Sequence, residues 1–116
     1  MPTRLSTDEA RRILKTTFAD TSATGDTPVV PAPGAGRKVV VYGFQLFNNV
    51  ATANNLRFKS AGNNIGPLIG MGANGSASVS PSGVPLFECN ANEALNLNLS
   101  AATAVGVLVY YTVESV

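Results

Sequence analysis

Apolar and polar residues alternate along much of the chain after residue 36, with the period of two that is typical of β-strands. Leu56 and Phe58 alternate with basic residues, while Leu95, Leu97 and Leu99 alternate with asparagines. Turn-forming Gly, Asn, Pro and Ser separate the apolar runs, and no helical pattern lies between them. The pattern predicts an all-β fold, an antiparallel β-sandwich with jelly-roll topology as its expected form.

The remaining strands are expected where β-branched, aromatic or small residues form short runs. These runs are Val39–Phe47, Ile65–Ile69, Ser76–Ser80, Val84–Cys89 and Val105–Val113. The last run is apolar on both faces, so we expect it at the centre of a sheet or at an interface. Pro67 interrupts the second run, which predicts a sheet edge or a bulge there.

The first 36 residues have a different pattern and predict an arm. Ser6–Phe18 reads as a short helix, because Ser6 and Glu9 fit a capping box. The apolar positions of this helix, at helical spacing, are Ala10, Ile13, Leu14 and Phe18. Ala19–Gly36 is rich in Pro, Gly and small polar residues and reads as an extended linker. The sequence therefore predicts an arm over residues 1–36 and a β-sandwich body over residues 37–116.

Composition narrows the class of function. A chain of 116 residues has room for one domain, and its formal net charge of +1 argues against a nucleic-acid partner. Only 13% of the residues are charged, and the surface must depend on amides and hydroxyls, which cost less to bury than ions. The polar N-terminus and the absence of long apolar runs predict a protein made in the cytoplasm, with no membrane partner.

The sequence contains few of the residues that catalysis or cofactor binding usually requires. The chain has no histidine, and its one cysteine, Cys89, is expected to be a small buried hydrophobe. Gly70–Gly75 matches a dinucleotide-binding glycine pattern, but no helix is expected after it. Glu88 and Glu93 could serve as the carboxylate pair of a glycoside hydrolase. They flank a turn between consecutive strands, however, where exposed glutamates are ordinary. We therefore expect no enzyme, no cofactor, no metal site and no small-molecule substrate.

Two groups of residues are candidates for binding. One is a basic cluster that could meet an acidic protein patch or phosphate: Arg37, Lys38, Arg57 and Lys59. The other is a set of tyrosines that could stack against a sugar: Tyr42, Tyr110 and Tyr111. Because neighbouring side chains on a strand point to opposite faces, at most one of the adjacent tyrosines can share a face with Tyr42.

The arm, the linker and a charge-poor body together resemble the cement or decoration proteins of tailed-bacteriophage heads. The segment from Ala91 through Ala102, followed by Val105–Tyr111, is similar to the closing hairpin of small phage virion proteins. The resemblance implies a virion protein on the capsid surface, which bridges neighbouring major capsid subunits and forms a homodimer or homotrimer. Repetition by shell symmetry would let each copy bind with moderate affinity.

Under this hypothesis two sets of residues make the contacts. The arm residues expected to anchor on the capsid are Leu5, Ile13, Leu14 and Phe18. The residues expected to mediate self-association lie on two strands and are Val107, Val109, Tyr111, Tyr42 and Phe44. Two alternatives remain open, a carbohydrate- or receptor-binding module and a tail or neck component with the same sandwich.

Overall fold

The computed structural model describes residues 14–116, and this range contains ten strands and no helix. The strands are β1 (Lys15–Thr21), β2 (Gly25–Val30), β3 (Arg37–Asn48), β4 (Asn54–Ser60), β5 (Asn63–Asn64), β6 (Ile69–Met71), β7 (Ser76–Val79), β8 (Phe87–Glu88), β9 (Leu95–Leu99) and β10 (Val105–Ser115). No helix of the described range is long and apolar enough to cross a bilayer.

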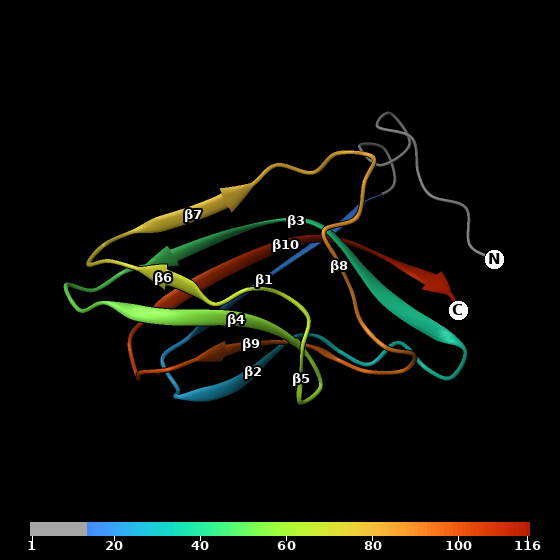
Figure 1. The fold of residues 1–116 in the computed structure, drawn as a ribbon, viewed down its shortest axis with the longest axis horizontal. Helices are drawn as coiled ribbons and strands as arrows, with labels where there is room; N and C mark the ends of the chain where they lie inside the picture. The colour runs from blue at the N-terminus through green and yellow to red at the C-terminus, as the bar shows by residue number, and fades with distance from the viewer. Residues whose placement is uncertain (1–13) are drawn as a thin grey trace.

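The strands form two antiparallel sheets (Figure 1). Sheet A has the order β1-β10-β3-β7, with β8 also paired to β3. Sheet B has the order β2-β9-β4-β5, with β6 also paired to β4. The all-β, antiparallel prediction is confirmed, and so is the central position of β10, which lies between β1 and β3.

The pairing is nested from the middle of the chain outward. β4 pairs with β5 and β6, β3 pairs with β7 and β8, β2 pairs with β9, and β1 pairs with β10. The chain thus resembles one long hairpin that is folded over to make two sheets. The links between nested pairs are β10 with β3 and β9 with β4.

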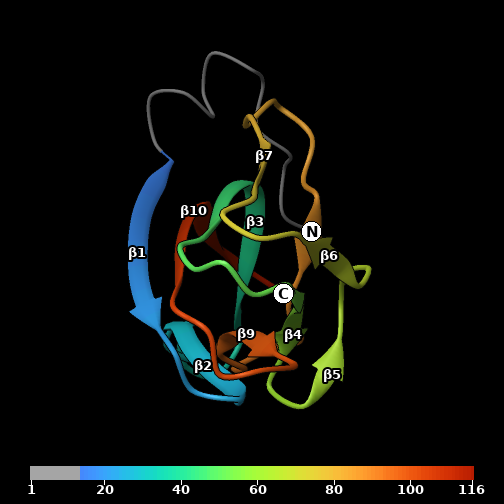
Figure 2. The same ribbon diagram turned by 90° about the vertical axis from the view of Figure 1, so that its left-hand side faces the viewer.

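The core lies between the two sheets, which Figure 2 shows as two layers. The leucines of β9 face inward and are at most 1% exposed, while the asparagines between them face outward. Phe44 of sheet A and Phe58 of sheet B bring their ring centroids within 5.2 Å, and Phe87 lies 5.6 Å from Phe58. Such tilted aromatic pairs add to the burial energy that holds the layers together.

The predicted helix over Ser6–Phe18 is wrong where it can be checked. Residues 1–13 lie outside the described range, but Lys15–Phe18 belong to β1. Lys15 pairs with Tyr111 and Phe18 with Leu108, so β1 is an edge strand of sheet A. A weak local helix preference is overridden because the segment pairs with β10 along its whole length, from Lys15 to Thr21.

The predicted linker over Ala19–Gly36 is also largely replaced by strands. It contains the end of β1 and all of β2, whose Val29 and Val30 are buried in the core. Pro28 is tolerated because β2 lies at the edge of sheet B. From Lys15 onward the predicted arm therefore belongs to the two-sheet body, and residues 22–24 and 31–36 connect its strands as loops.

Gly43 permits a close backbone crossing next to β3. A Cβ at this position would lie 2.6 Å from the carbonyl oxygen of Val79 and 2.8 Å from the nitrogen of Pro81. The segment that leaves β7 can approach β3 this closely only because residue 43 has no side chain.

Candidate functional site

Four loops gather at one end of the body, which we call the loop end. They connect β1 to β2, β3 to β4, β6 to β7, and β9 to β10. The register places them together, because Thr21 pairs with Val105 and Val105 pairs with Asn48. The loop end is on the left of Figure 1 and faces the viewer in Figure 2.

Two buried asparagines hold this end. The side chain of Asn48 donates to the carbonyl oxygens of Thr52 and Gly72, at 2.7 and 2.9 Å. The side chain of Asn54 donates to the carbonyl oxygen of Ala101 at 2.9 Å and to the hydroxyl of Thr103 at 2.6 Å. The amide of Ala101 returns a hydrogen bond to Oδ1 of Asn54 at 3.0 Å. The amide groups of both side chains are therefore fully used, whereas Oδ1 of Asn48 is buried without a hydrogen-bond partner. Buried hydrogen bonds of this kind fix loop positions.

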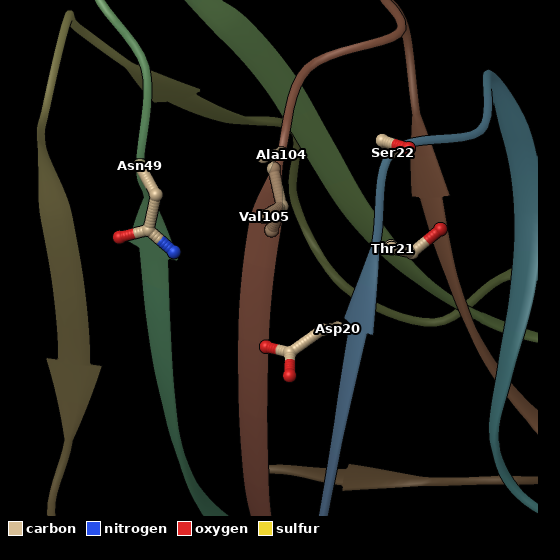
Figure 3. Close-up of a pocket in the computed structure, with 6 residues that line it drawn as sticks. All are labelled: Asp20, Thr21, Ser22, Asn49, Ala104 and Val105. Carbon is tan, nitrogen blue, oxygen red and sulfur yellow. The ribbon is translucent and has the colours of Figure 1, made fainter.

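A pocket of about 320 Å³ opens at the loop end on the side of sheet A. It is lined by Asp20, Thr21, Ser22, Asn49, Ala104 and Val105, which Figure 3 shows. Asp20 comes from β1 and Asn49 directly follows β3, and both side chains point toward β10, which runs between them. Neither side chain makes a hydrogen bond or ion pair with another residue of the described chain.

The floor between these two polar side chains is Gly106 of β10. A Cβ on Gly106 would lie 3.3 Å from Oδ1 of Asp20 and 3.7 Å from Nδ2 of Asn49. The same point is 3.8 Å from the ring of Phe47, which is 42% exposed. A carboxylate, an amide and an aromatic ring therefore converge over a backbone that lacks a side chain.

A second hollow, of about 310 Å³, lies on the side of sheet B. Its lining residues are Ala53, Asn54, Asn55, Gly70, Met71 and Gly72. The side chain of Asn54 is already committed to the loop network, so this hollow offers fewer free polar groups than the first.

The outer face of sheet A carries exposed apolar side chains next to the pocket. Phe18 of β1 is 73% exposed and lies directly opposite Leu108 of β10. Leu108 in turn is opposite Gln45, and Gln45 is opposite Ser78. The neighbouring row is Asp20, Gly106, Phe47 and Ser76. We call Phe18, Leu108 and Phe47 the apolar patch.

The residues predicted as the capsid arm fall in different places. Leu5 and Ile13 lie outside the described residues. Leu14 directly precedes β1 and is half-buried, whereas Phe18 is exposed on the outer face of sheet A. Phe18 is thus available for contact, but from a strand of the body and not from a helix.

The residues predicted to mediate self-association are mostly taken up by the core. Tyr42, Phe44, Val107 and Val109 are buried, and Tyr111 packs against the core. Because the four buried side chains face the core, they are not available to a second copy, and self-association itself stays a prediction. A run that is apolar on both faces does not reveal which side is exposed, and a bulge between Tyr110 and Tyr111 shifts the register against β3.

The four residues of the predicted basic cluster divide between the sheets. Arg37 and Lys38 begin β3 in sheet A, and Lys38 pairs with Glu88. Arg57 and Lys59 lie on the outer face of sheet B, where Nζ of Lys59 is 3.9 Å from Asp26. The tyrosine platform is not found either, because Tyr42 is fully buried and donates to Glu114 at 2.9 Å.

A small polar cluster lies near the opposite end of sheet B. The hydroxyl of Ser60 donates to Glu93 at 2.6 Å, and the side chain of Asn90 donates to the same carboxylate at 3.0 Å. These hydrogen bonds lower the pKa of Glu93. Burial raises the pKa of the nearby Cys89 thiol to about 11, so the thiol stays protonated near neutral pH. The predicted buried, unpaired state of Cys89 is confirmed.

The remaining motifs have structural explanations. Gly70–Gly75 runs from β6 into a turn in which the amide of Gly75 donates to Gly72, and a strand follows it. Glu88 is engaged with Lys38, while Glu93 accepts from Ser60. Within residues 14–116, no three His, Cys, Asp or Glu side chains gather as metal ligands would.

Comparisons with known proteins add little. No protein-family model matches the chain, and no curated protein sequence matches it. Among solved structures, the crystal structure of PirA is similar over 84% of this chain and 93% of that chain, with 9% identity and a TM-score of 0.44. A likeness at this level carries no argument about function.

Proposed function

We propose that this chain is a structural protein of a tailed-bacteriophage particle, of the decoration type. It binds the outer surface of the assembled capsid and bridges neighbouring subunits of the major capsid protein, which stabilises the head. The chain is made in the host cytoplasm and joins the virion as a homodimer or homotrimer. The proposal assigns the chain no catalytic step, cofactor, nucleic acid or membrane.

The nested pairing of the strands supports this proposal at the level of the fold. Two antiparallel five-stranded sheets made from one folded hairpin fit the arrangement of a jelly roll, and we propose that topology here. Jelly rolls are common in viral capsid and lectin domains, so the topology fits the proposed class without selecting it.

The observation that carries the proposal is the apolar patch. Phe18 is far more exposed than a large aromatic residue usually is, and Leu108 and Phe47 extend the apolar surface across β10 and β3. The positions that continue this face, Gln45 and Ser78, are polar but uncharged. Across the row of Phe18 and Leu108 a partner therefore meets no charged side chain, and the nearest carboxylate on this face is Asp20, in the row of Phe47.

Repetition supplies the strength that one small patch lacks. A dimer or trimer presents two or three patches at once, and a shell offers many equivalent sites at fixed spacing. Simultaneous binding raises the apparent affinity by orders of magnitude, about 10²-fold to 10⁴-fold, without any new contact. Each patch then needs only moderate affinity for its own capsid site.

The test is binding to heads of the phage that encodes the chain, stripped of their own copies. The variant F18S/L108S removes the apolar side chains of two neighbouring strands, while V84S/L86S removes two exposed apolar residues of the loop before β8. We expect F18S/L108S to lower occupancy at least about tenfold in co-sedimentation, and V84S/L86S to bind like the wild type.

Two further measurements complete this test. Thermal unfolding must show that both double variants are folded, and light scattering must show a dimer or trimer of the wild type. Heads that do not bind the wild type, or equal occupancy by F18S/L108S, would contradict the proposal. Binding to isolated tails but not to tail-less heads would favour a tail or neck component instead.

A further inference from the structure

The pocket at the loop end contains two polar side chains that the fold does not use. Asp20 and Asn49 point toward β10 from either side (Figure 3), yet neither makes a hydrogen bond or ion pair within residues 14–116. Both side chains are exposed to solvent, so leaving them without a hydrogen-bond partner has no burial cost. Their arrangement is therefore open to a ligand.

Gly106 lies between these two side chains, and its lack of a side chain matters for the space it leaves and not for its backbone conformation. Gly106 has no positive φ, so its backbone would accept any residue, and β-branched residues are favoured in strands. It is nevertheless a glycine within a run of large apolar residues. A side chain there would press on Oδ1 of Asp20 and fill the gap toward Asn49. Glycine inside a strand often marks a place where a ligand approaches the backbone closely.

The two polar groups define what a ligand must provide. The carboxylate of Asp20 only accepts hydrogen bonds, whereas the Nδ2 group of Asn49, which faces the floor, donates them. A hydroxyl group both donates and accepts, so a single hydroxyl or two neighbouring ones can satisfy both residues. Thr21 and Ser22 line the same pocket. The hydroxyl of Thr21 is engaged with the hydroxyl of Thr27 and the amide of Ala23, so Ser22 is the residue of this pair that can extend the set of hydrogen bonds.

The apolar part of the pocket fits the carbon skeleton of the same ligand. Ala104 lines the pocket, and the exposed ring of Phe47 lies beside it, 3.8 Å from the point that a Cβ of Gly106 would occupy. A sugar ring presents hydroxyls around its rim and C–H groups on its faces, and ligand sites usually combine apolar walls with a few convergent polar groups. The volume of about 320 Å³ is at the small end of such sites and suits one sugar ring.

The site is also held in place before any ligand arrives. The amide of Asn49 donates to the carbonyl oxygen of Ala104 at 2.9 Å, which joins the two loops that bear the pocket. Asn48, next in the chain, is buried and fixes the same loop from the other side. A preorganised site loses less entropy on binding.

We propose that this pocket binds a pyranose sugar, with its neighbouring hydroxyls between Asp20 and Asn49 and one face of its ring toward Phe47. This site shares Phe47 with the apolar patch, whereas Asp20 and Asn49 are not part of that patch. The titration below uses the free protein, so its outcome does not depend on binding to a capsid. The protein would then carry a glycan-binding site in addition to its proposed contact with a shell.

The experiment is an NMR titration of the full chain, labelled with ¹⁵N, with glucose, galactose, mannose and N-acetylglucosamine, each up to about 50 mM. We expect at least one sugar to shift amide signals around Asp20, Asn49 and Gly106, with a dissociation constant on the order of 1 to 10 mM. Shifts by no sugar, or shifts confined to another part of the protein, would overturn the proposal.

Variants then test the assignment of residues. D20A removes the acceptor and G106A fills the floor, and each should weaken binding at least about tenfold. D20N keeps the shape but loses the charge, and should weaken binding about threefold to tenfold. The control is D26N, which changes an exposed aspartate on the outer face of sheet B and should bind like the wild type. Wild-type affinity in both D20A and G106A would also overturn the proposal.

Discussion

The side chain of Asn54, at the start of β4, donates a hydrogen bond of 2.6 Å to the hydroxyl of Thr103, in the loop that leads into β10. The same amide group donates to the carbonyl oxygen of Ala101, so both of its protons are used. One buried side chain therefore fixes a loop that is 47 to 49 residues away in the sequence.

The variant N54D tests this relationship with almost no change in volume. A carboxylate at this position would face the carbonyl oxygen of Ala101 without a proton to offer, and the buried groups would lose their partners. We expect a loss of about 2–3 kcal/mol in the free energy of unfolding, measured by urea denaturation. N55D, at the neighbouring exposed position, should change it by less than about 0.5 kcal/mol. A stable N54D would mean that the loop is held by other contacts.

A second prediction concerns the close crossing at Gly43. In G43A the new methyl group would collide with backbone atoms of Val79 and Pro81, which cannot move aside as a flexible side chain could. We expect G43A to lose at least about 2 kcal/mol of stability. The matched control is G62A, where no atom lies within 4 Å of the new Cβ and no positive φ is recorded. Equal thermal unfolding temperatures for the two variants would refute this interpretation.

A third prediction concerns stability at high pH. The pKa of the Cys89 thiol is raised in the folded state from an ordinary 9.0 to about 11, first because of burial and also because of the charge of Glu93. A raised pKa means that the folded state binds the proton more tightly. Its contribution to stability is complete below pH 9 and is lost as the pH rises to about 11.

The measurement is urea denaturation between pH 8 and about pH 11, with C89A as the control. By about pH 11, the wild type should have lost on the order of 2 kcal/mol that C89A does not lose. At pH 8 the native thiol should also react with a thiol reagent only as fast as the protein unfolds. Parallel curves for the two proteins, or rapid labelling of the folded state, would contradict this account.

Much of the body could be read from the sequence because each strand with one buried face shows alternation. The leucines of β9 and the pair Leu56 and Phe58 in β4 are buried as the pattern predicts. The two edge strands β1 and β2 could not be read in this way. Phe18 in β1 faces solvent, so the apolar positions of the segment imitate a helix, and Pro28 in β2 argues locally against a strand.

The candidate site was harder to predict than the fold. Asp20 and Asn49 are 29 positions apart in the printed sequence and meet only because β1 and β3 flank β10. One local signal was present, since Gly106 interrupts the most strongly β-forming run of the chain. The face of Phe47 could not be assigned before the bulge in β3 was known, where Tyr42 is left without a register partner in β10.

The position of β10 also determines when the molecule can be completed during synthesis. β10 is made after all the other described strands, yet it lies between β1 and β3, so sheet A lacks its middle until β10 has left the ribosome. Until then β1 has no partner, and one edge of β3 is unpaired. Both edges can pair wrongly with other chains before β10 is in place. Shortening the chain by its last eleven-residue strand would remove the sheet's centre and not merely its end.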